Sequence, residues 1–318
     1  TSLARSCVRE PRMTLYPAVA RRAASPRPAG PAPPMMPTVF SIGLSNTPNW
    51  PVTATYATDV ELLAGHRILV TGVLTDDSLA YGIAAAARRE GADVVLSGAG
   101  RGLSLTKRMA KRLDISHEVL EIDVTNEDQM ATAAAHLSST WGRLDGLVHA
   151  IGYAPEKALG HGMLDTSFAD VATALEISTY SLAALVRHFR PLLQQSTAVG
   201  GASVVALDFD GARAYPHYDW MGVAKAGLES LGRYIAREVG PESIRVNMLA
   251  AGPIRTMAAR SIPGFEQFED SWAERAPLGW DVRDATAVHD TAVAMLSPLL
   301  RGTTASIIYV DGGAHAMG

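Results

Sequence analysis

The sequence predicts an α/β fold, in which a doubly wound parallel sheet of seven strands forms a single Rossmann-type domain. Two observations support this prediction. From Gly65 onward, short apolar runs alternate with longer segments of helical periodicity. The apolar runs are almost continuous Val, Ile and Leu, which is typical of strands that are covered on both faces. Successive strand–helix units joined by right-handed crossovers build such a sheet.

Each expected strand is an apolar run that leads into a turn or the start of a helix. Gly91 stands where the first helix is expected to end. Thr125, with Asp128 three residues later, is the expected N-cap of a following helix. The expected helices include 78–90, 126–141, 167–193 and 219–239. The expected strands are RILVTG (67–72), DVVLSG (93–98), EVLEID (118–123), LDGLVHAIG (144–152), ASVVALDF (202–209), IRVNMLAAG (244–252) and ASIIYVDGG (305–313).

The first 60 residues differ in composition from the rest of the chain. Residues 1–58 hold ten of the 18 prolines, six Arg and no Lys. Because proline lacks an amide hydrogen, we expect residues 1–60 to be disordered. Two interpretations remain open: an organelle transit peptide, or an upstream extension translated from a misassigned start codon, with Met35 or Met36 as the true beginning. We assign the folded domain to 61–318.

Composition argues against several classes of protein. A net charge of −4 and a pI near 6.1 give no basic field for nucleic acid. No apolar run reaches the roughly 18–20 residues needed to cross a bilayer. Cys7 is the only cysteine, so neither an internal disulfide nor a cysteine metal cage is expected. The nine His show no metal-binding spacing, and we expect no metal.

The end of the first strand has features of a dinucleotide site. A tight turn at Gly72 would bring the backbone close to a pyrophosphate, and the helix that starts near Ser78 would direct its free N–H groups at the phosphates. The usual fingerprint has three glycines in this loop, and here only Gly72 is present. An ordinary strand–turn–helix joint therefore stays open as an alternative.

The ends of the next strands leave the choice of cofactor open. No acid that would bind a ribose 2′-OH follows the second strand; Arg101 either meets a 2′-phosphate or is a solvated side chain. Asp123 and Val124 end the third strand, where adenine would bind, although Asp123 could equally satisfy free N–H groups at a helix start. Ile151 and Gly152 end the fourth strand and would let the backbone approach the cofactor sugar.

Tyr218 and Lys225 are candidate catalytic residues. Seven residues make almost two helical turns, so the two side chains share a face if the segment is helical. The alternative for Lys225 is a surface side chain with its ammonium group in water. Met221 occupies the position four before Lys225, where many nicotinamide-dependent reductases have a Tyr. The expected fifth strand offers no Ser or Thr at its end, so the chain is either an inactive reductase or one with a different geometry.

The motif YDWMGVAK (218–225) resembles the Tyr-x6-Lys signature of the enoyl-acyl-carrier-protein reductases, a branch of the short-chain dehydrogenase/reductases. The resemblance extends over 62–315 and is closest to the mycobacterial-type, NADH-dependent member that acts on long chains. It is carried by VHAIGYAP (148–155), LDFD (207–210), LAAGPIRT (249–256), RAPLGW (275–280) and YVDGGAH (309–315).

This resemblance implies reduction of the trans-2 double bond of an enoyl thioester by NADH in type II fatty-acid synthesis. Tyr218 would stabilise the enolate, and Lys225 would hold the nicotinamide ribose. A Tyr displaced along the helix suits a thioester oxygen, which lies farther from the hydride donor than a ketone oxygen does. Phe209 would lie beside the double bond. The implied cofactor contacts are Gly72, Ser78, Leu79, Asp123, Val124, Ile151, Gly152, Lys225, Ile254 and Thr256.

The resemblance also implies acyl carrier protein as partner, a homotetramer and a cytoplasmic location, with a substrate lid at about 255–275. The segment 256–272 is shorter than in the long-chain member. Because each buried CH₂ contributes about 0.8 kcal/mol, we expect a preference for short to medium acyl chains. NADH is the expected cofactor, with NADPH possible. The alternatives are a ketone or alcohol dehydrogenase of the same fold and a non-catalytic NAD(H)-binding protein.

Overall fold

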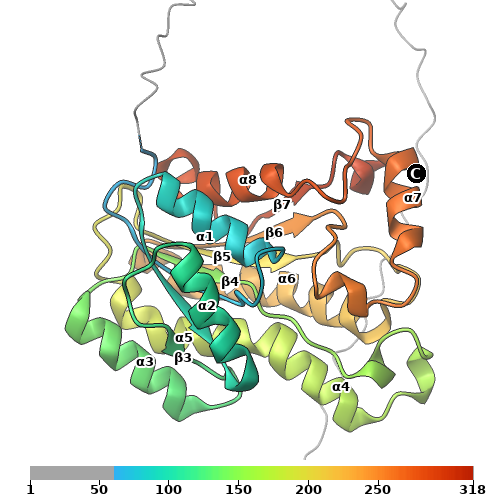
Figure 1. Cartoon of the computed structure of the whole chain (residues 1–318), viewed down its shortest axis with the longest axis horizontal. Helices are drawn as coiled ribbons and strands as arrows, with labels where there is room; N and C mark the ends of the chain where they lie inside the picture. The colour runs from blue at the N-terminus through green and yellow to red at the C-terminus, as the bar shows by residue number, and fades with distance from the viewer. Residues whose placement is uncertain (1–60, 318) are drawn as a thin grey trace, which may run out of the picture. The chain divides into compact units, whose positions relative to one another are not determined.

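A computed structural model describes residues 61–317. Within this range one parallel sheet of seven strands has the order β3-β2-β1-β4-β5-β6-β7, as Figure 1 shows. The predicted fold class and all seven predicted strands are confirmed, while the predictions for 1–60 lie outside the described residues. The strands are β1 (Arg67–Thr71), β2 (Asp93–Gly98), β3 (Leu120–Glu121), β4 (Gly146–His149), β5 (Ala202–Asp208), β6 (Ile244–Ala251) and β7 (Ile307–Val310).

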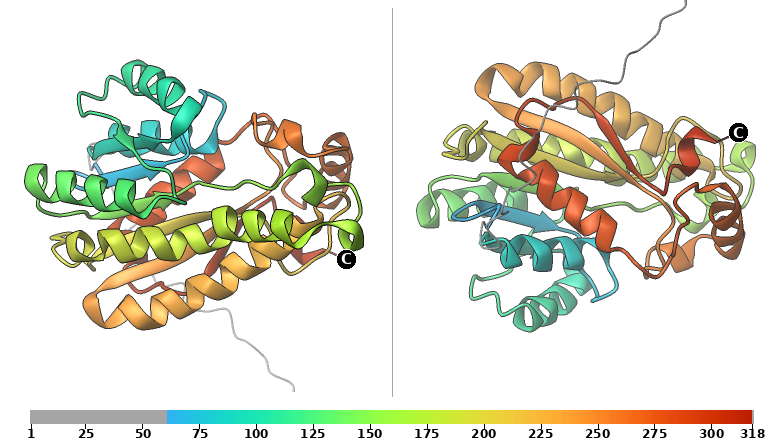
Figure 2. Two further views of the ribbon diagram at one scale, coloured as in Figure 1. Left: turned by 90° about the horizontal axis from the view of Figure 1, so that it is seen from below. Right: turned by 90° about the horizontal axis from the view of Figure 1, so that it is seen from above.

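Helices cover both faces of the sheet (Figure 2). One core cluster joins the sheet to α3, α5 and α6, and a second joins its other face to α1, α2 and α8. Because both faces are covered, the strands are buried along most of their length, which explains their continuous apolar sequence. The helices are α1 (Leu79–Arg89), α2 (Leu103–Arg112), α3 (Glu127–Thr140), α4 (Phe168–Leu175), α5 (Ser181–Leu193), α6 (Asp219–Val239), α7 (Glu266–Arg275) and α8 (Thr286–Leu296).

The order of the strands reverses between β1 and β4. The chain builds outward from β1 to β2 and β3, then returns to place β4 on the other side of β1. In such sheets the ligand binds beyond the carboxyl ends of the strands at this reversal. The topology therefore fixes where the functional site lies.

The helical segment 168–193 is continuous but irregular. A π-helical turn over Glu176–Tyr180 joins α4 to α5. Among the described helices, Phe168–Leu193 is long and apolar enough to cross a membrane by length and composition alone. Leu182, Leu185 and Phe189 of this segment are fully buried in the domain core, as expected for the core helix of a globular domain.

Two local predictions can be compared with the observed helix ends. Gly91 has a φ of +84° and follows Glu90, the C-cap of α1, which confirms it as the turn residue there. The predicted N-cap Thr125 is wrong. Asn126 caps α3, because its side-chain oxygen accepts from the N–H groups of Asp128 and Gln129. Thr125 instead donates its hydroxyl to Asp123.

Candidate active site

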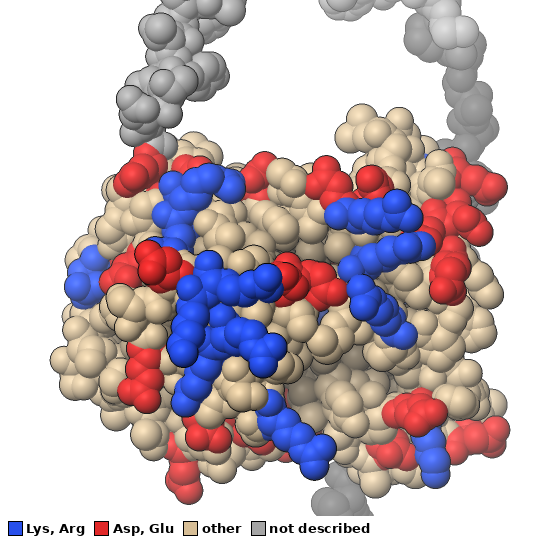
Figure 3. All heavy atoms as spheres, in the orientation of Figure 1, with Lys and Arg blue, Asp and Glu red and all other residues tan. Residues whose placement is uncertain are grey.

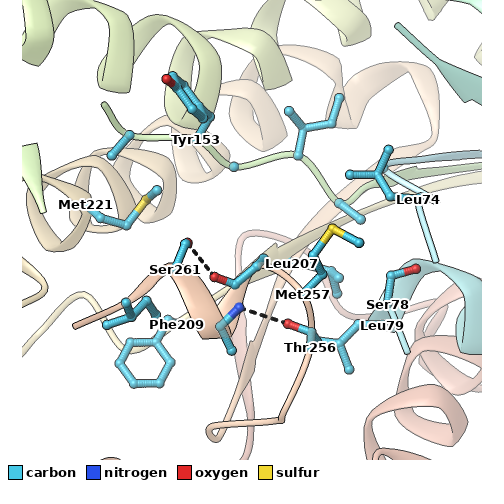
Figure 4. A pocket seen from close by; sticks show the side chains of 18 of the residues that line it. Leu74, Ser78, Leu79, Tyr153, Leu207, Phe209, Met221, Thr256, Met257 and Ser261 are labelled. Atoms are coloured by element: carbon cyan, nitrogen blue, oxygen red, sulfur yellow. Dashed lines mark hydrogen bonds between the residues drawn. The ribbon is translucent and has the colours of Figure 1, made fainter. Parts of the chain in front are cut away.

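A cavity of about 1040 Å³ opens beyond the carboxyl ends of the strands. Figure 4 shows Ser78 and Leu79 at one end of this cavity and Phe209 and Met221 at the other. The structure brings every site residue predicted from the sequence to its wall. These residues are Gly72, Ser78, Leu79, Asp123, Val124, Ile151, Gly152, Phe209, Tyr218, Lys225, Ile254 and Thr256.

The turn after β1 brings two parts of the backbone unusually close together. Gly72 has a φ of +80°, and a Cβ at this position would lie 2.0 Å from the carbonyl oxygen of Ala150. Ser78 caps α1, because its Oγ accepts from the N–H of Tyr81 at 3.3 Å and donates to Thr75 at 2.7 Å. The positive end of α1 therefore adjoins the cavity next to a turn that only glycine can form.

The neighbouring strand ends supply one carboxylate and exposed backbone. Asp123 Oδ1 accepts from the N–H and hydroxyl of Thr125, at 3.0 and 2.7 Å, in the turn before Asn126, and it bonds to none of the free N–H groups of α3. The lining residues at the end of β2 are Ser97, Gly98 and Ala99, and none is acidic. A glycine-only turn, a helix N-terminus and a carboxylate along one continuous cavity fit a nicotinamide dinucleotide.

Sequence analysis missed how the π-helical turn supports this wall. Ser178 Oγ donates to the carbonyl of Tyr153 and accepts from its N–H, both at 2.8 Å. Thr179, in the same turn, donates to the carbonyl of Ala224 on α6 at 2.7 Å. The turn thus ties the end of β4 to the helix that carries Lys225. Nothing in the sequence periodicity marks such a turn.

Tyr218 and Lys225 both reach the same end of the cavity. Tyr218 is buried at the N-cap position of α6, and its ring lies against Phe209 with centroids 5.1 Å apart. Lys225 is also buried, and its Nζ donates to the carbonyl of Leu207 at 2.8 Å. Lys225 is therefore not a solvated surface side chain. Met221, which lies between Tyr218 and Lys225 in the sequence, also lines the cavity, but its side chain has no proton to donate.

Burial shifts the pKa values of Tyr218, Lys225 and Asp208. It raises the pKa of the Tyr218 phenol, with a further contribution from Asp208, so the phenol keeps its proton at neutral pH. Burial lowers the pKa of Lys225, and Asp208 opposes that effect. Asp208, at the end of β5, has a pKa raised by burial to about 7 despite the nearby ammonium group. Neither carboxyl oxygen of Asp208 has a hydrogen-bond partner among the described residues.

Asp208 is a second feature that sequence analysis did not assign. The sequence shows it only as part of LDFD (207–210). Its position, an acidic residue at the end of an apolar strand, could have indicated a buried carboxyl group. Its isolation from hydrogen-bond donors depends on how α6 packs against β5, which the sequence does not specify.

The backbone on both sides of Tyr218 is left-handed. His217 has a φ of 62° and Asp219 a φ of 34°, and neither is glycine. Such conformations cost of order 1–3 kcal/mol and tend to occur at functional sites. Asp219 compensates in part, because its carboxylate accepts from the N–H of Gly160 at 2.8 Å. The start of α6 is thus held in a fixed conformation that directs Tyr218 to the cavity.

An aromatic cluster closes the cavity at the Tyr218 end. Phe209 packs against Phe268 and Trp272 of α7, with ring centroids 5.9 and 5.7 Å apart, and Phe268 also lines the cavity. Thr256 begins the segment that leads to α7, and its Oγ1 accepts from the N–H of Ala259 at 3.1 Å, a bond drawn in Figure 4.

Comparison with known proteins gives consistent results. Residues 72–315 match the family model described as Enoyl-(Acyl carrier protein) reductase. The chain is 43% identical to an enoyl-acyl-carrier-protein reductase (NADH) of Mycolicibacterium smegmatis, over 80% of this chain and 97% of that protein. It is 38% identical to the NADH enzyme FabI of Aquifex aeolicus, over 81% and 94% of the two chains. The FabI enzyme of Escherichia coli is 37% identical, over 79% and 94%.

Proposed function

Because this chain belongs to the enoyl-(acyl carrier protein) reductase family, we propose that it reduces the trans-2 double bond of an enoyl thioester on acyl carrier protein. The reaction belongs to type II fatty-acid synthesis, and NADH, when bound, supplies the hydride. The observation that carries this proposal is the placement of the buried Tyr218 and Lys225 at one end of a cavity of about 1040 Å³, whose wall also includes Ser78 at the start of α1.

Tyr218 is proposed to act on the thioester oxygen. When C3 accepts a hydride, negative charge collects on that oxygen as an enolate, and a proton taken up from water at C2 completes the reduction. A hydrogen-bond donor that is already fixed in place stabilises this charge better than water does. The phenol of Tyr218 holds its proton, lies in a largely apolar setting and has a fixed backbone on both sides. Phe209 lies against its ring and is proposed to contact the reacting double bond.

Lys225 is proposed to hold the ribose next to the nicotinamide. Its ammonium group is fixed by the carbonyl of Leu207, which leaves further N–H donors for the ribose hydroxyls. Ile254 and Thr256 are proposed to bind at the nicotinamide amide and the pyrophosphate. The remaining proposed cofactor contacts are Gly72, Ser78, Leu79, Asp123, Val124, Ile151 and Gly152.

Tyr218→Phe tests the role of the phenol. We expect kcat/KM for an enoyl thioester to fall by about 10²–10³-fold, while NADH binding is kept, because one donor to the developing charge is lost. Loss of NADH absorbance with crotonyl thioester measures the rate, and a fluorescence titration measures NADH binding. Tyr234→Phe is the control, since Tyr234 lies exposed on the same helix.

Three outcomes would contradict the proposal. Full activity of Tyr218→Phe would remove the phenol from the mechanism. Oxidation of NADH with ketones but not with enoyl thioesters would make the protein a carbonyl reductase of the same fold. NADH binding without turnover of either substrate class would make it a non-catalytic binding protein.

The proposal also covers the oligomeric state, the cellular location and the preferred length of the acyl chain. We expect a homotetramer, which light scattering would test, and a cytoplasmic location. A preference for short to medium acyl chains is supported by the aromatic cluster that closes the cavity.

A further inference from the structure

An ion pair joins two segments of the cavity wall that lie far apart in the sequence. Residues 74–78 form the turn between β1 and α1, and residues 256–262 lead from β6 towards α7. The Oδ2 atom of Asp77 in the first segment lies 3.4 Å from Nη2 of Arg260 in the second. Within the described residues no other hydrogen bond or ion pair links these two segments.

Asp77 and Arg260 are not themselves among the residues that line the cavity. Their neighbours are, namely Thr75, Ser78, Ala259 and Ser261. The side chain of Arg260 is 72% exposed and that of Asp77 is 33% exposed, so the ion pair lies on the solvent side of the wall. Figure 3 shows this face of the molecule, where acidic side chains lie between basic ones over α2 and basic ones near the segment before α7. The ion pair therefore bridges the wall without occupying the space of a ligand.

Both partners of the ion pair are held in place locally. Thr75 donates its hydroxyl to Oδ1 of Asp77, which leaves Oδ2 to face Arg260. Arg260 lies in the short 3₁₀ turn Ala259–Ser261, and its N–H donates to the carbonyl of Thr256 at 3.2 Å. Because the two groups are already positioned, less side-chain entropy is lost when the pair forms.

The flanks of the segment 256–262 are fixed to other parts of the domain. Before it, Arg255 pairs with Glu269 of α7 through two guanidinium nitrogens. After it, Pro263 packs against the turn at Gly160, where an added Cβ would lie 2.7 Å from the proline ring. Movement of the segment away from the turn before α1 therefore has to break the Asp77–Arg260 pair.

We propose that the Asp77–Arg260 ion pair keeps the cavity wall closed over a bound dinucleotide and slows the release of that cofactor. The inference rests on the proposed function in taking NADH as the ligand at the start of α1. A segment that covers a ligand has to open before the ligand leaves. Exposed ion pairs are weak, so the expected effect on the release rate is about two- to fivefold. The pair acts on cofactor exchange and contacts no reacting atom.

The test measures the release of NADH from the wild-type protein, Asp77→Asn, Arg260→Gln and the double variant. Stopped-flow fluorescence after mixing with excess NAD⁺ gives the dissociation rate without any enoyl thioester. At low salt each single variant should release NADH about two- to fivefold faster. The double variant should be no faster than the single ones, because all three lack the same interaction. Near 1 M salt, where the Debye length is about 3 Å, the four proteins should release NADH at similar rates.

Asp76→Asn is the matched control, because it removes the same charge one residue away from a carboxylate that pairs with Arg112 of α2. Its release rate should equal that of the wild type. Equal acceleration in this control would assign the effect to net charge near the phosphates. Acceleration in Arg260→Gln but not in Asp77→Asn would mean that Arg260 holds the phosphates directly.

Either of these results would overturn the proposal, and so would unchanged release in all variants or failure of the wild-type protein to bind NADH. A different result would contradict the proposed function alone. In that case the variants would change NADH release as expected, while the wild-type protein would reduce no enoyl thioester.

Discussion

Asp208 is a buried carboxyl group without a hydrogen-bond partner among the described residues. Charged groups of both signs lie near it. Lys225 on α6 lowers its pKa, whereas Glu229 on α6 and Asp210, two residues later in the chain, raise it. Because burial dominates, the carboxyl group stays protonated to about pH 7 in the folded protein. In the unfolded chain it loses its proton near its ordinary pKa, so the folded state binds the proton more tightly over this window.

We therefore predict that Asp208→Asn changes the pH dependence of stability. The folded wild-type protein holds the additional proton between pH 4 and 7, so its free energy of unfolding falls as pH rises through that window and then levels off. The Asn side chain does not titrate, so the free energy of unfolding of the variant does not fall for this reason. Its stability relative to wild type should increase by up to about 4 kcal/mol between pH 4 and 8. Urea midpoints measured across this range check the prediction, and parallel curves would contradict it.

Gly72 allows a second test at the scale of one residue. Gly72→Ala combines a positive φ with a Cβ only 2.0 Å from the carbonyl oxygen of Ala150, so β1 and β4 must move apart. Gly65→Ala is the control, because Gly65 has a φ of +71° with nothing within 4 Å of the added Cβ. The control should lose about 1–2 kcal/mol from backbone strain alone. Gly72→Ala should lose more in chemical denaturation, together with NADH affinity; equal losses would show that the close approach is unimportant.

The helix α7 closes one end of the cavity through its aromatic side chains. Phe268 lines the cavity, and its ring lies 6.1 Å from Trp272, which is almost fully buried behind it. A long acyl chain would have to displace this pair. We therefore propose that the cluster limits chain length by filling space, in addition to the expected shortness of the segment 256–272.

We predict that Phe268→Ala shifts the preference toward longer enoyl chains. Removing the ring opens space next to Phe209, and each additional buried CH₂ can then contribute about 0.8 kcal/mol, or roughly fourfold in kcat/KM. The ratio of kcat/KM for long over short enoyl thioesters is the measurement. Phe168→Ala is the control, because Phe168 lies 82% exposed on α4. A ratio equal to that of wild type would place the limit elsewhere.

The elements differ in how far the sequence specifies them. The strand β6 is a run of eight buried residues, and its mainly apolar sequence located it in spite of Arg245 and Asn247. The π-helical turn at Glu176–Tyr180 was not predicted, because it arises where Ser178 and Thr179 bond to Tyr153 and Ala224 across the fold. Gly72, Asp123 and Ile151 could be placed at the cavity from the sequence because strand ends converge in a parallel sheet. Ile254 and Thr256 were implied by the resemblance alone. The role of Asp208 could not, since it depends on the absence of donors in three dimensions.

At the scale of the whole molecule, the family match begins at residue 72 and the cavity is lined by residues 72–268. We predict that deleting residues 1–60 leaves kcat/KM for crotonyl thioester and the melting temperature close to those of the full chain. The described core contains the complete sheet and every proposed catalytic group. Steady-state kinetics and thermal unfolding of both proteins check this. A large loss of activity would give the first 60 residues a direct part in function.

The position of β1 inside the sheet, between β2 and β4, has a consequence for synthesis of the protein. Its partner β4 begins at Gly146, after 74 further residues have followed the end of β1 at Thr71. At roughly 5–20 residues per second, a ribosome needs about 4–15 s to make that stretch. During this time an apolar strand edge stands open to other nascent chains. Protection of this edge by chaperones in those seconds is therefore expected to raise the yield of folded protein.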